Sequence, residues 1–158
     1  MDTMNAIVTR RSIRKYTQQP VSEEIIKKLL VAAMSSPSAG NQQPWHYVVI
    51  NDRKIFEEIM KVHPYSQMLK EATVAILVCG DEQLEKHKGY WVQDCSASVQ
   101  NILLAAHSEG LGAVWLGIYP REDRVSGIRN VVGLPSNVIP LALIPVGYPA
   151  ETKQEQNR

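Results

Sequence analysis

The segment from Thr73 to Val78 limits the possible folds most, because it is an almost unbroken apolar run. Such a run is typical of a strand whose two faces are both covered by other elements. Helical and strand-like patterns alternate around it. We expect helices over residues 4–9, 21–34, 52–63, 90–109 and 121–131, and strands over residues 45–50, 73–78, 114–118 and 138–146. This order predicts a layered sheet with helices on its faces, and it leaves open whether the strands run parallel.

Single residues predict where some of these elements begin, end or bend. Ser22 and Asp52 can cap the N-termini of two helices, and Gly110 can end the longest helix in a left-handed conformation. Pro140 and Pro145 interrupt the last strand. Because proline cannot donate a backbone hydrogen bond, we expect this strand to lie at an edge of the sheet or to contain a bulge.

The length and the charge of the chain narrow its class. A chain of 158 residues fits one domain. A net charge of +1 argues against a general nucleic-acid binder, which would carry a basic excess. No run approaches the roughly 20 apolar residues of a membrane helix, and the first residues lack the apolar stretch of a signal peptide. We therefore expect a cytoplasmic protein with no nucleic-acid and no membrane partner.

No familiar catalytic or metal-binding motif occurs in the sequence. The two cysteines, Cys79 and Cys95, have no metal-ligand spacing, so we expect buried, reduced thiols. The histidines are scattered and form no HExxH pattern: His46, His63, His87 and His107. A GxSxG nucleophile motif and a Walker lysine loop are also absent. We therefore expect no metal site and no catalytic side chain, and reactivity that comes from a bound cofactor.

A basic segment near the N-terminus is the first candidate binding site. Arg10, Arg11, Ser12 and Arg14 place three guanidinium groups and a hydroxyl within five residues. The planar donor fork of arginine matches the oxygens of a phosphate group. The pattern therefore indicates a phosphate site, and the alternative is a solvated basic turn.

An uncharged loop over residues 37–44 is the second candidate. Ser38, Ala39 and Gly40 are small enough to let the backbone approach a flat ligand, and residues 41–43 offer neutral donors and acceptors. These groups suit a heteroaromatic ring, and the alternative is a simple connecting loop. Gly117, at the end of a predicted strand, could likewise expose a backbone N–H group to a ligand, or it could mark a bulge.

Four segments, in chain order, resemble the nitroreductase family of FMN enzymes: RRSIRKY, SPSAGNQQPWHYVVI, GLGAVWLGIYP and PLALIPVGYPAE. The resemblance spans almost the whole chain and implies a single FMN-binding domain over residues 1–158. It implies an α+β fold, a mixed sheet flanked by helices in an intertwined homodimer. The implied activity is that of an FMN-dependent oxidoreductase. It would pass electrons from NADH or NADPH to a small organic acceptor, such as a nitroaromatic or a quinone, with ping-pong kinetics.

The resemblance also implies a role for individual residues. Arg10 and Ser12 would hold the FMN phosphate, with Arg11 near the phosphate or the ribityl chain and Arg14 near the pyrimidine edge of the flavin. One set would reach over the flavin from the partner subunit: Pro37, Ser38, Ala39 and Asn41. Another would present backbone N–H groups near the flavin N5 atom: Leu116, Gly117 and Ile118.

Two departures from the family pattern leave the site incomplete. Gln67 stands where relatives often carry a basic residue, so it keeps a hydrogen bond and gives up a charge. Relatives also extend into a C-terminal arm with a basic residue for the phosphate, for which Lys153 and Arg158 are the candidates here.

Other functions stay open at this point. They include another flavin reaction, such as dehalogenation, enone reduction or flavin fragmentation, a flavin-binding regulatory module without turnover, and a nucleotide-binding domain without a redox role. The sequence does not distinguish NADH from NADPH or identify the acceptor.

Overall fold

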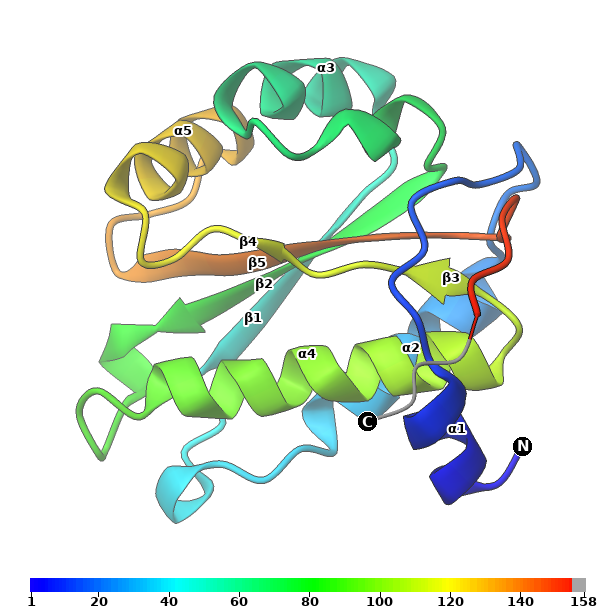
Figure 1. Ribbon diagram of the computed structural model, residues 1–158. Helices are drawn as coiled ribbons and strands as arrows, with labels where there is room; N and C mark the ends of the chain where they lie inside the picture. The colour runs from blue at the N-terminus through cyan, green and yellow to red at the C-terminus, as the bar shows by residue number, and fades with distance from the viewer. Residues whose placement is uncertain (155–158) are drawn as a thin grey trace.

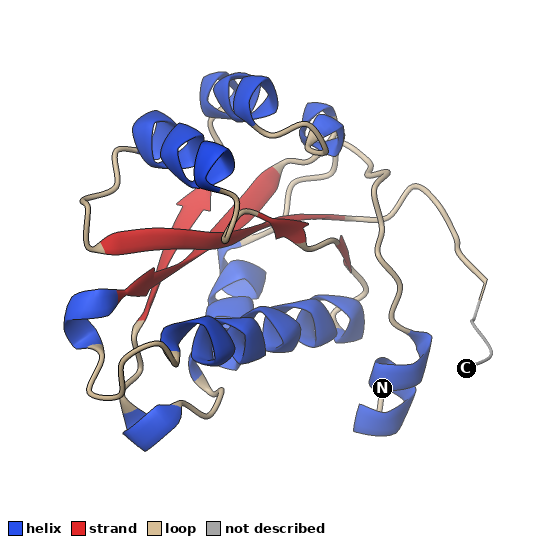
Figure 2. Ribbon diagram, turned by 60° about the vertical axis from the view of Figure 1, so that its left-hand side comes forward, coloured by secondary structure: helices blue, strands red, loops and turns tan. Residues whose placement is uncertain are grey.

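The computed structural model describes residues 1–154, which form one sheet between two layers of helices (Figures 1 and 2). The five-stranded sheet has the order β1-β2-β5-β3, and β4 also pairs with β5. The strands are β1 (Trp45–Ile50), β2 (Val74–Asp81), β3 (Gly112–Ala113), β4 (Leu116–Gly117) and β5 (Val138–Gly147). All pairings between these strands are antiparallel, which answers the question that the sequence left open. The fold is α+β, as expected.

Helices cover both faces of the sheet (Figure 1). One layer contains α3 (Arg53–Val62) and α5 (Glu122–Val132), and the other contains α2 (Glu23–Met34) and α4 (Trp91–Ser108). The short helix α1 (Thr3–Thr9) lies beside the C-terminal end of α4. Three single turns of 3₁₀ helix complete the described chain: η1 (Ala39–Asn41), η2 (Gln67–Lys70) and η3 (Glu82–Leu84). None of the helices formed by residues 1–154 is long and apolar enough to cross a membrane.

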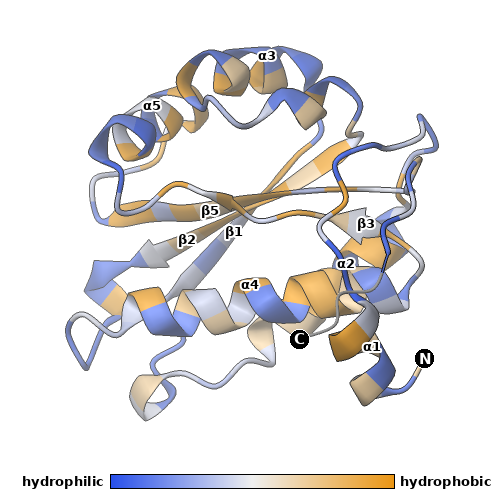
Figure 3. Cartoon of the chain, in the orientation of Figure 1, coloured by the Kyte–Doolittle hydropathy of each residue, from blue (hydrophilic) through white to orange (hydrophobic). Residues whose placement is uncertain are grey.

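The central strand β2 explains why the molecule has two helical layers. Val74, Ile76 and Val78 join the apolar cluster under α2 and α4. The alternate residues of β2 point to the other face and join the cluster under α3 and α5. Every residue of β2 is buried, so the apolar strands lie between the two helical layers, as the hydropathy colouring shows (Figure 3). The prediction of a strand covered on both faces is confirmed.

The last strand takes the second of its two predicted alternatives. β5 lies inside the sheet, between β2 on one side and β3 and β4 on the other, and not at an edge. The predicted bulge is present, because Val78 pairs with Ala142 and Cys79 with Pro140, which leaves Leu141 as the extra residue. A bulge lets a proline-containing strand remain inside a sheet.

The predicted strand over residues 114–118 is two short strands. β3 and β4 pair with β5 in a single register, with Ala113 opposite Val146 and Leu116 opposite Leu143. The interruption between them lies opposite Pro145, which has no backbone N–H group to donate. The sheet edge on this side is therefore short and broken.

The predicted helix ends are confirmed. The Ser22 side chain accepts a hydrogen bond from the Ile25 N–H group, and the Asp52 side chain accepts one from Lys54. Gly110, just after α4, has the expected left-handed conformation, with φ +79°.

Candidate functional site

The basic segment lies against the edge strand β3. Ser12 forms a parallel bridge with Ala113, and the Ile13 N–H group donates to the Ala113 carbonyl at 3.0 Å. On the C-terminal side, Ala150 N–H donates to the Lys15 carbonyl at 2.8 Å. These backbone contacts hold the segment at the sheet edge, so its arginines start from a fixed backbone.

Only some of the Arg11 side-chain donors have hydrogen-bond acceptors among the neighbouring residues. Its Nε donates to the Gln154 carbonyl at 2.9 Å, and its Nη1 donates to the Arg10 carbonyl at 2.7 Å. Its Nη2 is buried and has no hydrogen-bond acceptor among residues 1–154. A buried donor without an acceptor costs about 1–3 kcal/mol, and more when it is charged. Arg11 is therefore suited to an anionic acceptor, as the phosphate of a nucleotide would be.

A cavity of about 290 Å³ adjoins Arg11. Thr9, His107, Glu151 and Lys153 contribute to its walls. His107 Nε2 lies 2.8 Å from the Thr9 hydroxyl oxygen. Burial lowers the pKa of His107 from its ordinary value, and the charges of Arg10 and Arg11 lower it further. The two arginines therefore act electrostatically on this cavity, and an anion bound there would offset their repulsion of a protonated His107.

The uncharged loop is fixed from α4 by Asp94. This buried carboxylate accepts hydrogen bonds from the Ala39 N–H group at 2.9 Å and from Gln42 Nε2 at 2.7 Å. Gln42 Oε1 in turn accepts from the backbone N–H groups of Lys86 and His87, at 2.9 and 3.0 Å. Gln42 is thus a structural residue whose amide is already engaged. Sequence reasoning missed Asp94, because no local pattern around it points to this role.

The backbone of this loop is strained. Gly40, Asn41 and Gln43 have φ of +54°, +54° and +47°. Left-handed residues other than glycine are uncommon and gather at functional sites. A Cβ atom on Gly40 would overlap the exposed His87 ring, so that ring would have to move if Gly40 were replaced. The loop therefore keeps an energetically unfavourable shape, which Asp94 stabilises.

Gly117 presents its backbone to the outside of the sheet edge. Ile118 N–H donates to the Leu141 carbonyl at 3.0 Å, so the backbone of Ile118 faces β5. Because backbone direction alternates along a strand, the N–H and carbonyl groups of Gly117 face away from β5. Its carbonyl accepts from His63 Nε2 at 2.9 Å and from Arg124 Nη1 at 3.1 Å. No atom lies within 4 Å of a Cβ built on Gly117, so a ligand can approach it closely.

Comparison with known proteins decides the family. A model described as the nitroreductase family matches residues 7–63 and 55–148. The chain belongs to the nitroreductase family. A protein of Methanothermobacter thermautotrophicus, provisionally named NADH dehydrogenase/NAD(P)H nitroreductase, is 60% identical over 151 residues, which cover 96% of this chain and 79% of the relative.

Solved structures of nitroreductase-family proteins agree in fold. One from Parabacteroides distasonis, provisionally named NADH dehydrogenase/NAD(P)H nitroreductase, has a TM-score of 0.95 at 43% identity and covers 99% of this chain and 92% of its own. One from Desulfovibrio desulfuricans, provisionally described as a nitroreductase in complex with FMN, has a TM-score of 0.87 at 32% identity. That match covers 100% of this chain and 92% of the other.

The remaining residues expected at the nitroreductase site lie as follows. Leu116 and Ile118 are buried, and the Ile118 N–H group is bonded to β5, so the expectation that Ile118 offers its N–H group to the flavin is wrong. Gln67 is exposed at the start of η2. Arg14 has an exposed side chain, and its N–H group donates to Glu151 Oε1 at 2.7 Å. Arg158 lies outside the described residues, and Lys153 lines the cavity beside Arg11.

One chain does not bring the basic segment and the uncharged loop together (Figures 1 and 2). Ala39 is bonded to Asp94 near the beginning of α4, whereas Thr9 contacts His107 near its end. At about 1.5 Å per residue, these two attachment points lie about 20 Å apart along the helix. The two segments are therefore at opposite ends of α4.

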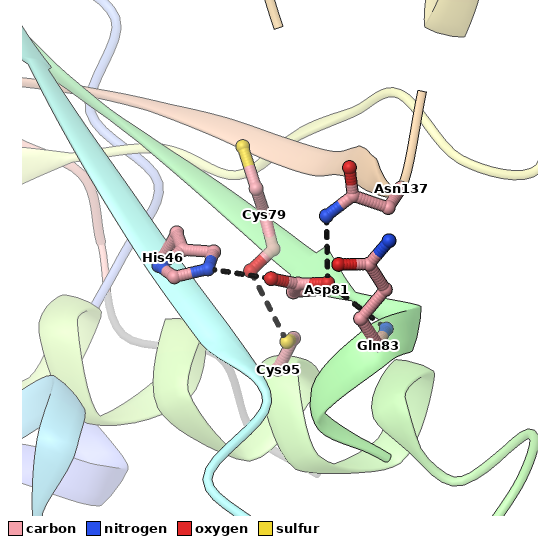
Figure 4. Close-up of polar contacts among 6 residues, drawn as sticks. All are labelled: His46, Cys79, Asp81, Gln83, Cys95 and Asn137. Atoms are coloured by element: carbon pink, nitrogen blue, oxygen red, sulfur yellow. Dashed lines mark hydrogen bonds and ion pairs between the residues drawn. The ribbon is translucent and has the colours of Figure 1, made fainter. Parts of the chain in front are cut away.

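A separate polar cluster closes the end of β2 (Figure 4). The Asp81 carboxylate accepts from Asn137 Nδ2 at 3.0 Å and from the Gln83 N–H group at 2.9 Å, and it lies 2.9 Å from His46 Nε2. Burial raises the pKa of Asp81, but these hydrogen bonds outweigh it and the net pKa is lowered. The cluster joins β1, β2 and the start of β5, which is a structural role.

Both cysteines are free and buried, in agreement with the prediction. The Cys95 thiol donates to the Cys79 carbonyl, with 3.6 Å between sulfur and oxygen (Figure 4). Burial raises the pKa of both thiols, that of Cys79 to about 12. They are therefore protonated and unreactive in the folded chain.

Replacing Asp94 with asparagine tests how the loop is held. The new Nδ2 group would face the Gln42 amide donors, and Gln42 cannot reverse without losing its bonds to Lys86 and His87. We expect Asp94→Asn to lower the free energy of unfolding by about 1–3 kcal/mol. Chemical denaturation at fixed protein concentration measures it, with the exposed Gln93→Ala on the same helix as the control. Equal stabilities of the two variants would contradict this role.

The buried His63 predicts a pH dependence of stability. Burial lowers its pKa from the ordinary 6.5, and Arg124 lowers it further, whereas the Gly117 bond and Asp123 oppose the shift. The unfolded chain therefore binds this proton at higher pH than the folded chain does. Stability should be greatest above pH 6.5 and fall as the pH drops below that value.

Urea unfolding between about pH 5 and about pH 8 measures this dependence. His63→Gln should flatten it but not abolish it, because His107 has a lowered pKa and contributes with the same sign. A variant with the full wild-type slope would show that His63 is not its source.

Proposed function

We propose that this chain is an oxidoreductase that uses FMN to pass electrons from NADH or NADPH to a small organic acceptor, such as a nitroaromatic or a quinone. The observation that carries the proposal is the pairing of two features along one sheet edge. The buried Arg11 Nη2, which has no hydrogen-bond partner within residues 1–154, lies at one end, beside the Ser12–Ala113 bridge, and the outward-facing Gly117 backbone lies at the other. At about 3.3 Å per residue, Ala113 and Gly117 are about 13 Å apart along the edge.

The donor groups at the two ends of this sheet edge fit the two ends of FMN, its phosphate and its ring. Arg10, Arg11 and Ser12 would hold the phosphate, and Lys153 adds a second source of positive charge at the neighbouring cavity. The Gly117 N–H group would bind the polar edge of the ring, and its missing side chain leaves room for that approach. The Desulfovibrio desulfuricans structure, which is described as a complex with FMN, supports this assignment.

When bound, FMN supplies the ability to accept a hydride from a nicotinamide and to give electrons to a second molecule. The residues of this chain bind and orient it. A cation at the Arg14 position would favour the more negatively charged form of the cofactor. Leu116 and Ile118 keep the strand rigid through burial, and Gln67 would offer a neutral hydrogen bond from η2.

A second copy of the chain would complete each site. Pro37, Ser38, Ala39 and Asn41 lie at the end of α4 that is distant from the basic segment, so we assign them to the ring bound by the partner. The surface of α1 and α2 carries exposed apolar side chains, which suit burial against a second copy: Met4, Ile7, Val8, Val31 and Met34. We therefore propose an intertwined homodimer over the single domain of residues 1–158.

We propose a cytoplasmic location, which the two cysteines support. Cys79 and Cys95 are free, and their burial leaves them as thiols. Free thiols persist in reducing compartments, so we assign the protein to the cytoplasm.

Two-substrate kinetics test the proposed function. Initial rates are measured over a grid of NADH or NADPH and of a quinone or nitroaromatic acceptor. One open ring face that serves both molecules in turn gives parallel double-reciprocal lines. Absence of nicotinamide-dependent turnover with every acceptor contradicts the enzyme, and intersecting lines contradict the shared face.

A further inference from the structure

The Gly117 carbonyl oxygen lies within hydrogen-bond distance of two side-chain donors, the buried His63 after α3 and the half-buried Arg124 of α5. His63 follows α3 directly and is only 1% exposed, and its Nε2 lies 2.9 Å from the carbonyl oxygen. Arg124, from α5, donates through Nη1 at 3.1 Å. A carbonyl oxygen has two lone pairs, so these two donors saturate it.

Other contacts determine how each donor is oriented. The Tyr65 N–H group donates to His63 Nδ1 at 3.2 Å, so Nδ1 is the acceptor and Nε2 carries the hydrogen of the neutral ring. The Arg124 guanidinium lies 5.3 Å from the centre of the Tyr65 ring, within cation–π range. The segment 63–65 therefore supports both donors at once.

We propose that His63 and Arg124 are positioning residues for the cofactor ring, because together they fix the Gly117 backbone with its N–H group directed outward along the sheet edge. This inference rests on the proposed function, since it assumes that the ring lies against Gly117. Glycine loses more conformational freedom on ordering than any other residue, so its orientation needs such external contacts. The low pKa of His63 agrees with this role, because the ring stays neutral and keeps its Nδ1 acceptor.

Arg124 adds an electrostatic effect to its positional one. Its permanent positive charge lies against the Gly117 carbonyl oxygen, close to where the ring would bind. A nearby cation favours the form of a cofactor that carries more negative charge. Arg124 should therefore raise the reduction potential of bound FMN, whereas the neutral His63 should act through orientation alone.

The test separates orientation from charge with paired variants. Arg124→Met removes the donor and the charge, Arg124→Gln removes the charge and leaves a shorter polar side chain, and Arg124→Lys keeps the charge. His63→Leu removes the imidazole donor, and His63→Gln restores an N–H donor. Arg121→Met is the control, because Arg121 is an exposed cation at the beginning of the same helix.

Three readouts apply to the whole dimeric protein: the midpoint potential of bound FMN, the dissociation constant of FMN from the apo-protein, and the amide resonance of Gly117 in apo-protein labelled with ¹⁵N. Arg124→Met and Arg124→Gln should lower the equilibrium constant for two-electron reduction about tenfold, which is about 30 mV. Arg124→Lys should recover most of this shift. His63→Leu should move the Gly117 resonance and weaken FMN binding about tenfold, and His63→Gln should recover both.

The outcomes separate a failure of the proposed function from a failure of the positioning role. Wild-type protein that binds no FMN contradicts the proposed function itself. The positioning role is overturned if the wild-type protein binds FMN and if His63→Leu and the Arg124 variants leave three quantities unchanged: the midpoint potential of FMN, its dissociation constant and the Gly117 amide resonance. If Arg124→Met does not fold, Arg124→Gln decides the electrostatic part, because an unchanged potential there overturns it. A shift of equal size in Arg121→Met would make the effect one of general charge and also overturn the proposal.

Discussion

Replacing Arg10 and Arg11 together with alanine should raise the dissociation constant of FMN by at least about 100-fold. Each charge-assisted hydrogen bond to a phosphate contributes about 1.5–3 kcal/mol, and two such bonds are lost. Arg11 offers the buried Nη2 that has no acceptor among the described residues, so its loss removes a donor that folding alone leaves unsatisfied. The effect should therefore fall on binding much more than on folding.

Fluorescence titration of FMN into the apo-proteins measures this effect, and chemical denaturation of the same samples measures stability. The control is Lys54→Ala with Lys61→Ala, which removes the same charge from two exposed positions on α3. The single variant Ser12→Ala should weaken binding in the same direction by a smaller factor. If the double arginine variant binds FMN with wild-type affinity, the basic segment is a solvated turn and not a phosphate site.

The heterodimer isolated after co-expression of two inactive variants should have about half of the wild-type activity. One variant carries Arg10→Ala and Arg14→Ala, and the other carries Ser38→Phe and Asn41→Tyr. If each site takes its basic segment from one chain and its loop from the other, the heterodimer contains one doubly damaged site and one intact site. The reason is the separation of about 20 Å between the attachment points of these segments on α4.

Sedimentation of the isolated heterodimer first establishes that it contains one copy of each variant, and each parent homodimer is assayed beside it. A site built within one chain would leave both sites damaged and return no activity. A verified heterodimer without regained activity would therefore contradict the shared site. An active wild-type monomer at low concentration would contradict both the shared site and the dimer.

Local sequence signals predicted those parts of the fold that depend on nearby residues. Ser22 and Asp52 cap helices because their side chains reach N–H groups two or three residues ahead. The apolar run of β2 is buried on both faces because a helical layer packs on each side of the sheet. Strand order depends on contacts far apart in sequence, so Pro140 and Pro145 left an edge position and a bulge both open. The sheet keeps β5 inside, with a bulge opposite β2 and an interruption in its other neighbour.

The residues of the candidate site also fall into those that local sequence could indicate and those that only the folded chain brings together. The arginine cluster and the small-residue loop have compositions that suit a ligand, and the family resemblance, rather than composition alone, selected them as candidates. Asp94, His63 and Arg124 act through contacts to residues that are distant in sequence or on another element, and no pattern in their own neighbourhoods indicates this. His63 was one of four scattered histidines in the sequence, and only the folded chain brings it to Gly117.

The absorption spectrum of the FMN-loaded protein, recorded without oxygen while NADH and then NADPH are added, tests the central claim most directly. The account predicts that at least one of the two nicotinamides bleaches the flavin absorbance near completion, and that a quinone or nitroaromatic added afterwards restores it. A loaded protein that keeps its full absorbance with both nicotinamides would contradict the oxidoreductase and leave a flavin-binding module. A protein that takes up no FMN would contradict the cofactor site itself.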